Sequence, residues 1–458
     1  MLNCYEESLL KNSTLPSEWQ SQSSLDEFLS FLQSNWDQRY VLFEDNKLSK
    51  KQQFIEFLGS KSIKTQNYVG TIVFKNQQLN IFPKVFRSEK DDNDISDLKM
   101  DHLMKNLVQW ISYCNRMNYP FININADLDD AANLKELFVS LYVRSVQNTL
   151  DRGLFYRYEE HTEDVRSIKG KFDIKDYIIR KYPNGKMDTF KCTFSEFEYD
   201  NVLNRIIKFT CKSLLSETSV KNQKIIRNIL IKLSDVSDVR CTPQDCDTIR
   251  LNYLQRHYQT ILTLSKIFLL NKTSSYNLDN NESFCFLFPT EYLFEGFIGG
   301  FLQETLQGKA KVRLQASEVP LINDVVIGGK SFGSAFKMRH DILVEHKEKG
   351  LFILDTKYKQ LERIQKTIEY KNYLSATVDQ DDLYQVIEYA AHRELKDVYL
   401  LYPMYRYESE ENEDTFLVRE TVSGNQKISV HIVRLPFIFE DDIEATKEHL
   451  KKEVLKIF

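Results

Sequence analysis

The stretch that decides the fold is Met338 to Lys359, MRHDILVEHKEKGLFILDTKYK. Two apolar runs flank the polar segment EHKEKG, and a polar turn that ends in glycine is typical of a β-hairpin. If the turn is centred near Glu348, Asp341 and Asp355 lie seven residues to either side of it. The two acidic residues are then direct cross-strand neighbours, with Cβ atoms about 5 Å apart on one face.

This pairing predicts a metal site. Two facing carboxylates repel each other unless a cation lies between them, and hard oxygen ligands suit Mg²⁺, with Mn²⁺ as an alternative. Lys357 lies two residues beyond Asp355 and therefore points to the same face. In such a site the metal activates a water molecule for attack on a phosphodiester, and Lys357 orients that water or stabilises the developing charge. A plain salt bridge with a carboxylate is the alternative role for Lys357.

The tripeptide Asp-x-Lys alone has little specificity, because it occurs four times, starting at Asp45, Asp97, Asp173 and Asp355. Only the last follows a four-residue apolar run, LFIL, and has a matching aspartate across a predicted hairpin. An acidic residue beside such a run is costly to bury without a partner. The combination therefore favours a functional site at Asp355.

Two predicted helices hold further candidates. Glu295, within EYLFEGFIGGFL, either reaches the metal as a third carboxylate ligand or lies at the solvent edge. Gln385 and Tyr389, within LYQVIEY, are four residues apart and share a helix face. They either contact the scissile strand or hold Lys357, and a position at the edge of the core is the alternative for Tyr389.

A chain of 458 residues predicts two or three domains. Its hydrophobic fraction of 42% can fill well-packed cores, and 14 Gly and 9 Pro are too few for long disordered stretches. The formal net charge is -5, so any contact with phosphates must come from a local basic surface.

Seven widely spaced cysteines, an odd number, indicate reduced thiols rather than a disulfide framework. The first residues lack the basic start and apolar run of a signal peptide, and no apolar segment approaches membrane-spanning length. We therefore expect a cytoplasmic protein.

The pattern along the chain predicts an α+β multidomain fold. A hairpin is expected from strands at 68–74 and 79–82, helices at 100–115 and 133–150, and a strongly helical middle region at about 196–270. The last part has a mixed α/β order: helix 291–306, strands 338–344 and 351–358, helix 381–393 and strand 398–402. Three polar stretches indicate loops or boundaries, at 88–97, 271–283 and 408–414.

One basic stretch, residues 166–186, is a candidate for contact with phosphates. It holds seven Lys and Arg against two Asp, with aromatic residues between them. Such contact would be independent of DNA sequence. Arg166, Lys169 and Lys171 are the strongest candidates, and a solvated charged face is the alternative.

The hairpin resembles the PD-(D/E)XK nuclease core, and the Gln385–Tyr389 pair resembles the Q-x-x-x-Y element of its RecB-like branch. More narrowly, the chain resembles McrC, the nuclease subunit of McrBC-type modification-dependent restriction systems. The segments that carry this resemblance are GTIVFKNQQLNIFPK (70–84), SIKGKFD (167–173), FEYDNVLNRIIK (197–208), FEGF (294–297), RHDILV (339–344), ILDTKYK (353–359), LYQVIEY (383–389) and LLYP (400–403). His340 stands where the family pattern has proline before the first aspartate.

The resemblance implies a DNA endonuclease that works with a McrB-like AAA+ GTPase hexamer, stimulates its GTP hydrolysis, and cuts double-stranded, modified DNA. It implies three parts: a partner-binding α+β domain at 1–165, a basic element and helical connector at 166–275, and a PD-(D/E)XK nuclease domain at 276–458. The segment IGGKS (327–331) lacks the first glycine of a complete phosphate-binding loop, so we expect this chain to bind no nucleotide itself.

Two other functions fit the same features. One is a stand-alone RecB-like repair nuclease, for which a long N-terminal region is unnecessary. The other is a catalytically inert activator of the AAA+ ring and DNA-binding scaffold, against which the intact Asp341, Asp355 and Lys357 argue.

Overall fold

The computed structural model describes most of the chain, in residues 2–37, 39, 51–59, 62–87, 100–114, 134–153, 155–255, 257–275, 283–317, 320–322, 324–327, 330–361, 378–406, 416–423, 426–440 and 442–458. The polar stretches expected at 88–97 and 408–414 lie outside these residues. The stretch expected at 271–283 lies partly outside them, and its first residues continue a helix to Ser275.

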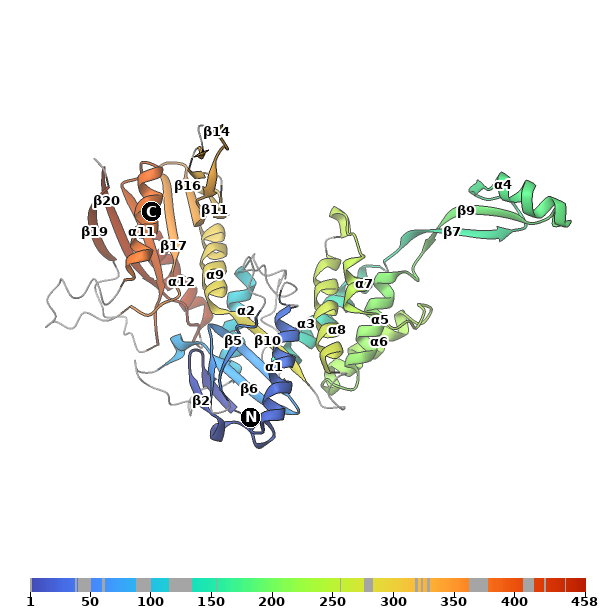
Figure 1. Cartoon of the computed structure of the whole chain (residues 1–458), viewed down its shortest axis with the longest axis horizontal. Helices are drawn as coiled ribbons and strands as arrows, with labels where there is room; N and C mark the ends of the chain where they lie inside the picture. Colours follow the sequence, from blue (N-terminus) through green and yellow to red (C-terminus); the bar gives the residue numbers. More distant parts are fainter. Residues whose placement is uncertain are drawn as a thin grey trace. The chain divides into compact units, whose positions relative to one another are not determined.

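The chain forms two compact units (Figure 1). Unit 1 combines residues 1–134 with residues 274–458, and unit 2 consists of residues 135–273. The expected boundary near 275 lies close to the return of the chain into unit 1, and the boundary at 165 lies inside unit 2. The assignment of a role to each part stays a prediction.

The first part of unit 1 contains a sheet of order β1-β6-β5-β10. The predicted hairpin is confirmed as β5 (Tyr68–Phe74) and β6 (Gln77–Phe82). Its turn is shorter than predicted, because Lys75 and Asn76 both adopt positive φ, 50° and 61°. The outer strands are β1 (Leu2–Tyr5), parallel to β6, and β10 (Phe284–Pro289), antiparallel to β5.

Gly70 is required where β5 meets β10. Its φ is 136°, and a Cβ there would lie 2.1 Å from the carbonyl oxygen of Phe286. Every residue of β10, FCFLFP, is buried. A strand more than 200 residues downstream of β5 therefore completes the N-terminal sheet and leads directly into the next helix.

The first sixty-odd residues, for which the sequence suggested no fold, form a helix and a small sheet. The sheet has the order β2-β4-β3, with β2 at Leu9–Lys11, β3 at Ile55–Leu58 and β4 at Ser62–Thr65. Helix α1 (Gln22–Asp37) places Phe28 and Phe31 against Phe74, with ring centroids 5.1 and 5.5 Å apart. Aromatic packing thus fixes this segment on β5.

The second part of unit 1 contains a six-stranded sheet of order β11-β16-β17-β18-β20-β19. The strands are β11 (Ala310–Ala316), β16 (His340–His346), β17 (Gly350–Thr356), β18 (Asp397–Pro403), β19 (Phe416–Ser423) and β20 (Gln426–Leu435). Strands β17, β18 and β20 are parallel, and the other pairings are antiparallel. The predicted mixed order is confirmed, while β11, β19 and β20 were not anticipated.

Among the described residues, helices α9 (Thr290–Thr305), α11 (Gln380–His392) and α12 (Ile443–Leu455) accompany this sheet (Figure 1). Helix α11 packs through Val386, Tyr389 and Ala390 onto alternate residues of β16, β17, β18 and β20. Between β11 and β16 the chain forms two small ladders, β12 (Pro320–Ile322) with β15 (Ala335–Lys337) and β13 (Val326–Ile327) with β14 (Lys330–Ser331).

Helix α2 (Met100–Tyr113) joins the two parts of unit 1. A Cβ on Gly296 would lie 2.0 Å from Cys114 Sγ, and a Cβ on Gly300 2.0 Å from the carbonyl oxygen of Tyr113. The small residues of FEGFIGGFL therefore let the end of α2 approach α9. Trp110 stacks on Phe437 at 4.2 Å and donates a hydrogen bond to the same residue's carbonyl oxygen.

A buried carboxylate makes a second link. Glu6 is fully buried and accepts hydrogen bonds from Tyr358 Oη (2.6 Å), Lys84 N (2.8 Å) and Thr290 Oγ1 (2.5 Å). Thr290 begins α9, and Tyr358 follows Lys357. One side chain from the start of the chain thus links α9, which carries Glu295, to the segment after β17, which carries Lys357.

Unit 2 is a group of helices with a projecting arm built on a three-stranded sheet of order β7-β9-β8 (Figure 1). The helices are α3 (Leu134–Arg152), α5 (Val202–Leu214), α6 (Val220–Lys232), α7 (Pro243–Asp247) and α8 (Tyr258–Ser275). The arm consists of β7 (Arg157–Val165), β8 (Lys171–Phe172) and β9 (Phe190–Glu198), with the short helix α4 (Ile174–Asp176) at its end. The helical middle region is confirmed, and the arm was not predicted.

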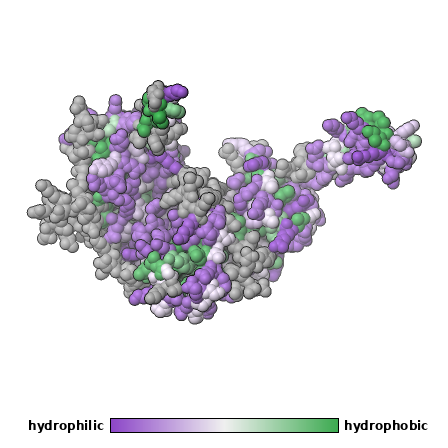
Figure 2. All heavy atoms as spheres, in the orientation of Figure 1, coloured by the Kyte–Doolittle hydropathy of each residue, from purple (hydrophilic) through white to green (hydrophobic). Residues whose placement is uncertain are grey.

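Apolar side chains gather at the far end of the arm (Figure 2). Large apolar residues that are more than half exposed there are Ile168, Ile174, Ile178, Ile179, Tyr182 and Met187. Exposed apolar patches of this kind are typical of surfaces that meet another molecule.

All seven cysteines are free and buried, as their spacing predicted. Among the described helices, none combines the length and the apolar character needed to cross a bilayer.

Glu6 provides a test of the link between the two parts of unit 1. We expect Glu6→Ala to lower the free energy of unfolding by about 3 kcal/mol, because three buried donors lose their acceptor. Glu6→Gln keeps an acceptor for these donors and should cost much less. Chemical denaturation of both variants measures the difference, and equal losses would contradict the role of Glu6.

The wild-type protein and the Glu6→Gln variant also test a pH effect. Burial raises the pKa of the Glu6 carboxyl despite the opposing influence of Lys84. The folded chain therefore holds this proton more tightly than the unfolded chain. Wild-type stability should fall, relative to Glu6→Gln, as pH rises from the ordinary glutamate pKa to the raised one.

Candidate active site

The hairpin β16–β17 has the register that its turn predicted. Ile342 pairs with Leu354 and His346 with Gly350, so the register continued by one residue places Asp341 opposite Asp355. Asp341 Oδ2 accepts hydrogen bonds from Thr356 N (3.0 Å) and Thr356 Oγ1 (2.9 Å). These bonds orient the Asp341 carboxylate across the end of the hairpin.

Asp355 is 1% exposed, because it shares a face with Ile353 at the margin of the core under α11. Burial and then the nearby Asp341 carboxylate raise the pKa of Asp355 to about 7. Lys357 Nζ lies 2.7 Å from Asp355 Oδ2, yet neither oxygen of Asp355 accepts a well-aligned hydrogen bond from any described residue. A buried carboxylate with such free acceptor capacity suits a cation.

Lys357 is held by α11. Its Nζ donates to Gln385 Oε1 (3.1 Å), Gln385 Nε2 donates to Tyr389 Oη (2.8 Å), and Tyr389 Oη donates to the carbonyl oxygen of Arg339 (3.0 Å). This continuous chain of donors fixes the amine beside Asp355. Of the alternatives for Gln385 and Tyr389, the structure supports holding Lys357.

Asp382 belongs to the same cluster, although sequence analysis did not select it. It is 7% exposed, its Oδ1 lies 3.5 Å from Lys357 Nζ, and its Oδ2 lies 2.7 Å from Lys359 Nζ. Burial acts to lower the pKa of Lys357, but the carboxylates of Asp355, Asp382 and Asp341 outweigh it and raise the pKa. The amine therefore stays protonated.

Glu295 lies on α9 and is connected to Asp341 through a third residue. Gln315 Nε2, from β11, donates to Glu295 Oε1 and also to Asp341 Oδ1 (3.2 Å). Gln315 was not selected from the sequence. The feature that distinguishes Gln315 is its left-handed backbone conformation (φ 51°), which a sequence pattern does not reveal.

The donor set partly fits the expected divalent cation. Asp341 and Asp355 face each other as required, and the oxygens of Asp355 have acceptor capacity to spare. Within the described ranges, however, no three His, Cys, Asp or Glu side chains gather closely enough to hold a metal ion by themselves. Glu295 does not complete such a group with Asp341 and Asp355, because the Gln315 amide lies between the Glu295 and Asp341 carboxylates. The ligand set Asp341, Asp355 and Glu295 therefore stays a prediction.

The basic candidates for contact with DNA lie on the arm of unit 2, far from the hairpin in sequence. Arg166, Lys169 and Lys171 are exposed. Lys169 Nζ lies over the ring of Phe194 at 3.7 Å from its centroid, and Gly170 (φ 68°) packs on the backbone of Thr193. Gly170 thereby brings Lys169 and Lys171 onto β9, a local arrangement that explains the pattern Lys-Gly-Lys.

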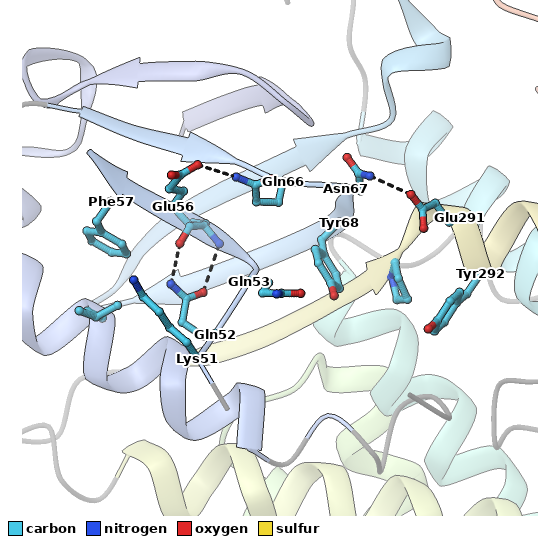
Figure 3. A pocket seen from close by; sticks show the side chains of 13 residues that line it. Lys51, Gln52, Gln53, Glu56, Phe57, Gln66, Asn67, Tyr68, Glu291 and Tyr292 are labelled. Atoms are coloured by element: carbon cyan, nitrogen blue, oxygen red, sulfur yellow. Dashed lines mark hydrogen bonds between the residues drawn. The ribbon is translucent and has the colours of Figure 1, made fainter. Parts of the chain in front are cut away.

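Unit 1 also contains an open cavity of about 670 Å³ beside β3 and the start of α9 (Figure 3). Its polar side chains bond to one another, Gln66 to Glu56 (3.1 Å) and Asn67 to Glu291 (3.0 Å), as Figure 3 shows. The lining residues offer no cluster of acid, base and nucleophile. The carboxylate–lysine cluster is therefore the better candidate for chemistry.

Comparison with solved structures finds similar chains. A chain in the refined half-complex from a tetradecameric assembly of Thermococcus gammatolerans McrB AAA+ hexamers with bound McrC is 17% identical, with 100% of both chains covered and a TM-score of 0.67. A chain in the cryo-EM structure of the Thermococcus gammatolerans McrBC complex is 20% identical over 70% of this chain and 89% of that one, with a TM-score of 0.48. No curated protein matches.

The particular family follows from a family model. The model described as "McrBC 5-methylcytosine restriction system component" matches residues 63–403, well over half of the chain. The chain therefore belongs to this McrBC family, as the sequence motifs indicated.

Asp382 gives a direct test of how the amine is held. We expect Asp382→Ala to lower the free energy of unfolding by about 3 kcal/mol, because it leaves the partly buried Lys357 with one carboxylate fewer. Asp381→Ala, an exposed neighbour on α11, is the matched control and should change little. Denaturant titrations decide this, and similar small effects at both positions would show that Asp382 does not hold Lys357.

Proposed function

We propose that this chain is the DNA endonuclease subunit of a GTP-dependent, McrBC-like restriction complex, with a PD-(D/E)XK centre built on Asp341, Asp355 and Lys357. The observation that carries the proposal is the hairpin register, which brings two acidic side chains and an amine to one point while Asp355 is buried. Membership of the McrBC family supports it independently.

In this proposal Asp341, Asp355 and Glu295 hold Mg²⁺ or Mn²⁺, which when bound supplies a Lewis acid and a water of lowered pKa. Lys357 stays protonated beside Asp355 and orients the attacking water or stabilises charge on the phosphate oxygens. Gln385 and Tyr389 fix the direction of the Lys357 amine through their hydrogen bonds. The carboxylates of this chain position the cation, and α11 positions the amine.

We further propose that the partner is a McrB-like AAA+ GTPase hexamer in the cytoplasm, engaged through residues 1–165, whose GTP hydrolysis this chain stimulates. Support comes from the similar structure, which is described as McrB AAA+ hexamers with bound McrC. The nucleotide belongs to the partner. The substrate is double-stranded, modified DNA, in keeping with the family description.

The arm of unit 2 is proposed to contact DNA phosphates through Arg166, Lys169 and Lys171. Basic residues also line a hollow of about 790 Å³ on the same arm, where Lys186 and Lys191 accompany Lys181, paired with Asp164, and Arg180, paired with Asp176. Their charge is local, since the whole chain has a net charge of -5. Such a surface favours contact with the backbone of DNA rather than with its bases.

The decisive variant is Lys357→Ala, assayed with the cognate AAA+ GTPase, modified DNA and Mg²⁺. We expect cleavage to fall at least about 100-fold, because the transition state loses its positioned positive charge. Stimulation of GTP hydrolysis should persist, because the hairpin remains folded. Lys349→Ala, an exposed residue in the turn of the same hairpin, is the control and should cut normally.

The result also separates the alternatives. Loss of cleavage and stimulation together in a folded Lys357→Ala protein would contradict the division of labour. Cleavage without any partner would favour a stand-alone RecB-like repair nuclease. Stimulation by a wild-type chain that never cuts would favour an inert activator and scaffold.

The arm is tested by the double variant Arg166→Ala/Lys171→Ala. Removing two phosphate contacts should weaken DNA binding and reduce the slope of log affinity against log salt by about 2. Lys224→Ala/Arg227→Ala, an equal change of charge on the exposed face of α6, should leave the slope unchanged. Normal DNA binding with lost GTPase stimulation would instead assign the arm to the partner.

A further inference from the structure

Gln315 occupies a strained position directly opposite Asp341. In the pairing of β11 with β16, Leu314 faces Ile342 and Ala316 faces His340, so Gln315 is the residue that faces Asp341. Its φ is 51°, in the left-handed region, which residues other than glycine and asparagine rarely adopt. Strain of this kind clusters at functional sites and is stabilised by the surrounding structure.

The strained backbone directs the Gln315 side chain between two predicted metal ligands. Its Nε2 donates to Glu295 Oε1 on α9 and, at 3.2 Å, to Asp341 Oδ1 on β16. Gln315 thus connects the α9 carboxylate to the hairpin carboxylate through these two hydrogen bonds. The amide nitrogen lies where two acidic groups need a positive or donating group between them.

A primary amide at this position can interact favourably with its neighbours in two orientations. Rotation of the terminal group by a half-turn exchanges the donating nitrogen for an accepting oxygen of nearly the same size and position. Without a cation, the two carboxylates favour the orientation in which the amide nitrogen of Gln315 donates to them. A divalent cation selects the oxygen, because amide carbonyl oxygens are ligands for hard cations.

We propose that Gln315 is a further residue of the metal site, which donates to Glu295 and Asp341 without a cation and turns its oxygen to the cation when one binds. The inference rests on the proposed function of the site and adds a neutral ligand to its acidic ones. It also explains why an amide, rather than a third acid, stands between the two carboxylates: a carboxylate there would repel both neighbours whenever the metal is absent.

The test measures Mn²⁺ binding by calorimetry, and the rise in Tm on adding Mn²⁺ to EDTA-treated protein, with the full chain. Gln315→Gly is the cleanest variant, because glycine accepts the positive φ without strain and the protein should fold. We expect its Mn²⁺ affinity to fall about tenfold or more, with a smaller rise in Tm. Gln303→Ala, on α9, removes an amide that donates to the Val312 carbonyl oxygen (3.3 Å) on β11; it is the control and should bind normally.

Gln315→Glu completes the design. Its carboxylate should lower Tm in EDTA by repelling Glu295 and Asp341, and should restore Mn²⁺ binding to at least the wild-type level. Wild-type affinity and an unchanged Tm shift in Gln315→Gly would overturn the role of Gln315 and leave the proposed site intact. Absence of Mn²⁺ binding in the wild-type chain would overturn the site itself and this inference with it.

Discussion

The ionisable side chain of Asp355 is buried at the margin of an apolar core, and much of unit 1 is arranged around that constraint. A carboxylate removed from water needs a nearby positive charge or a proton. Lys357 supplies the charge at 2.7 Å, and α11 keeps that amine in place through Gln385. Burial, and then repulsion from the opposing Asp341, raise the pKa of Asp355 to about 7 despite Lys357. In the proposed site, a bound divalent cation would relieve this repulsion.

The same unit joins distant segments so that this cluster can form. Strand β10 completes the N-terminal sheet and continues into α9, which carries Glu295. Glu6 binds Thr290 at the start of α9 and Tyr358 beside Lys357. The first part of the chain is therefore physically continuous with both sides of the candidate site.

Local patterns predicted the elements that local forces build. The hairpin register followed from alternation with period two and from the turn, because a slip of one residue would turn every side chain to the other face. Gln385 and Tyr389 were selected because residues four apart share a helix face. The first sixty-odd residues were not predicted, since α1 is defined by packing on Phe74 rather than by a distinctive pattern. The arm was missed because its strands expose polar residues.

The sequence by itself determined the β16–β17 hairpin, the pairing of Asp341 with Asp355, and the side on which Lys357 lies, because these depend on residues close together in the chain. Tertiary structure alone decided that Asp382 and Gln315 join them. Asp382 arrives when α11 docks on the sheet, and Gln315 when β11 pairs with β16 through a left-handed residue. Neither event leaves a periodic trace in the sequence, because both depend on contacts between elements and on one backbone angle.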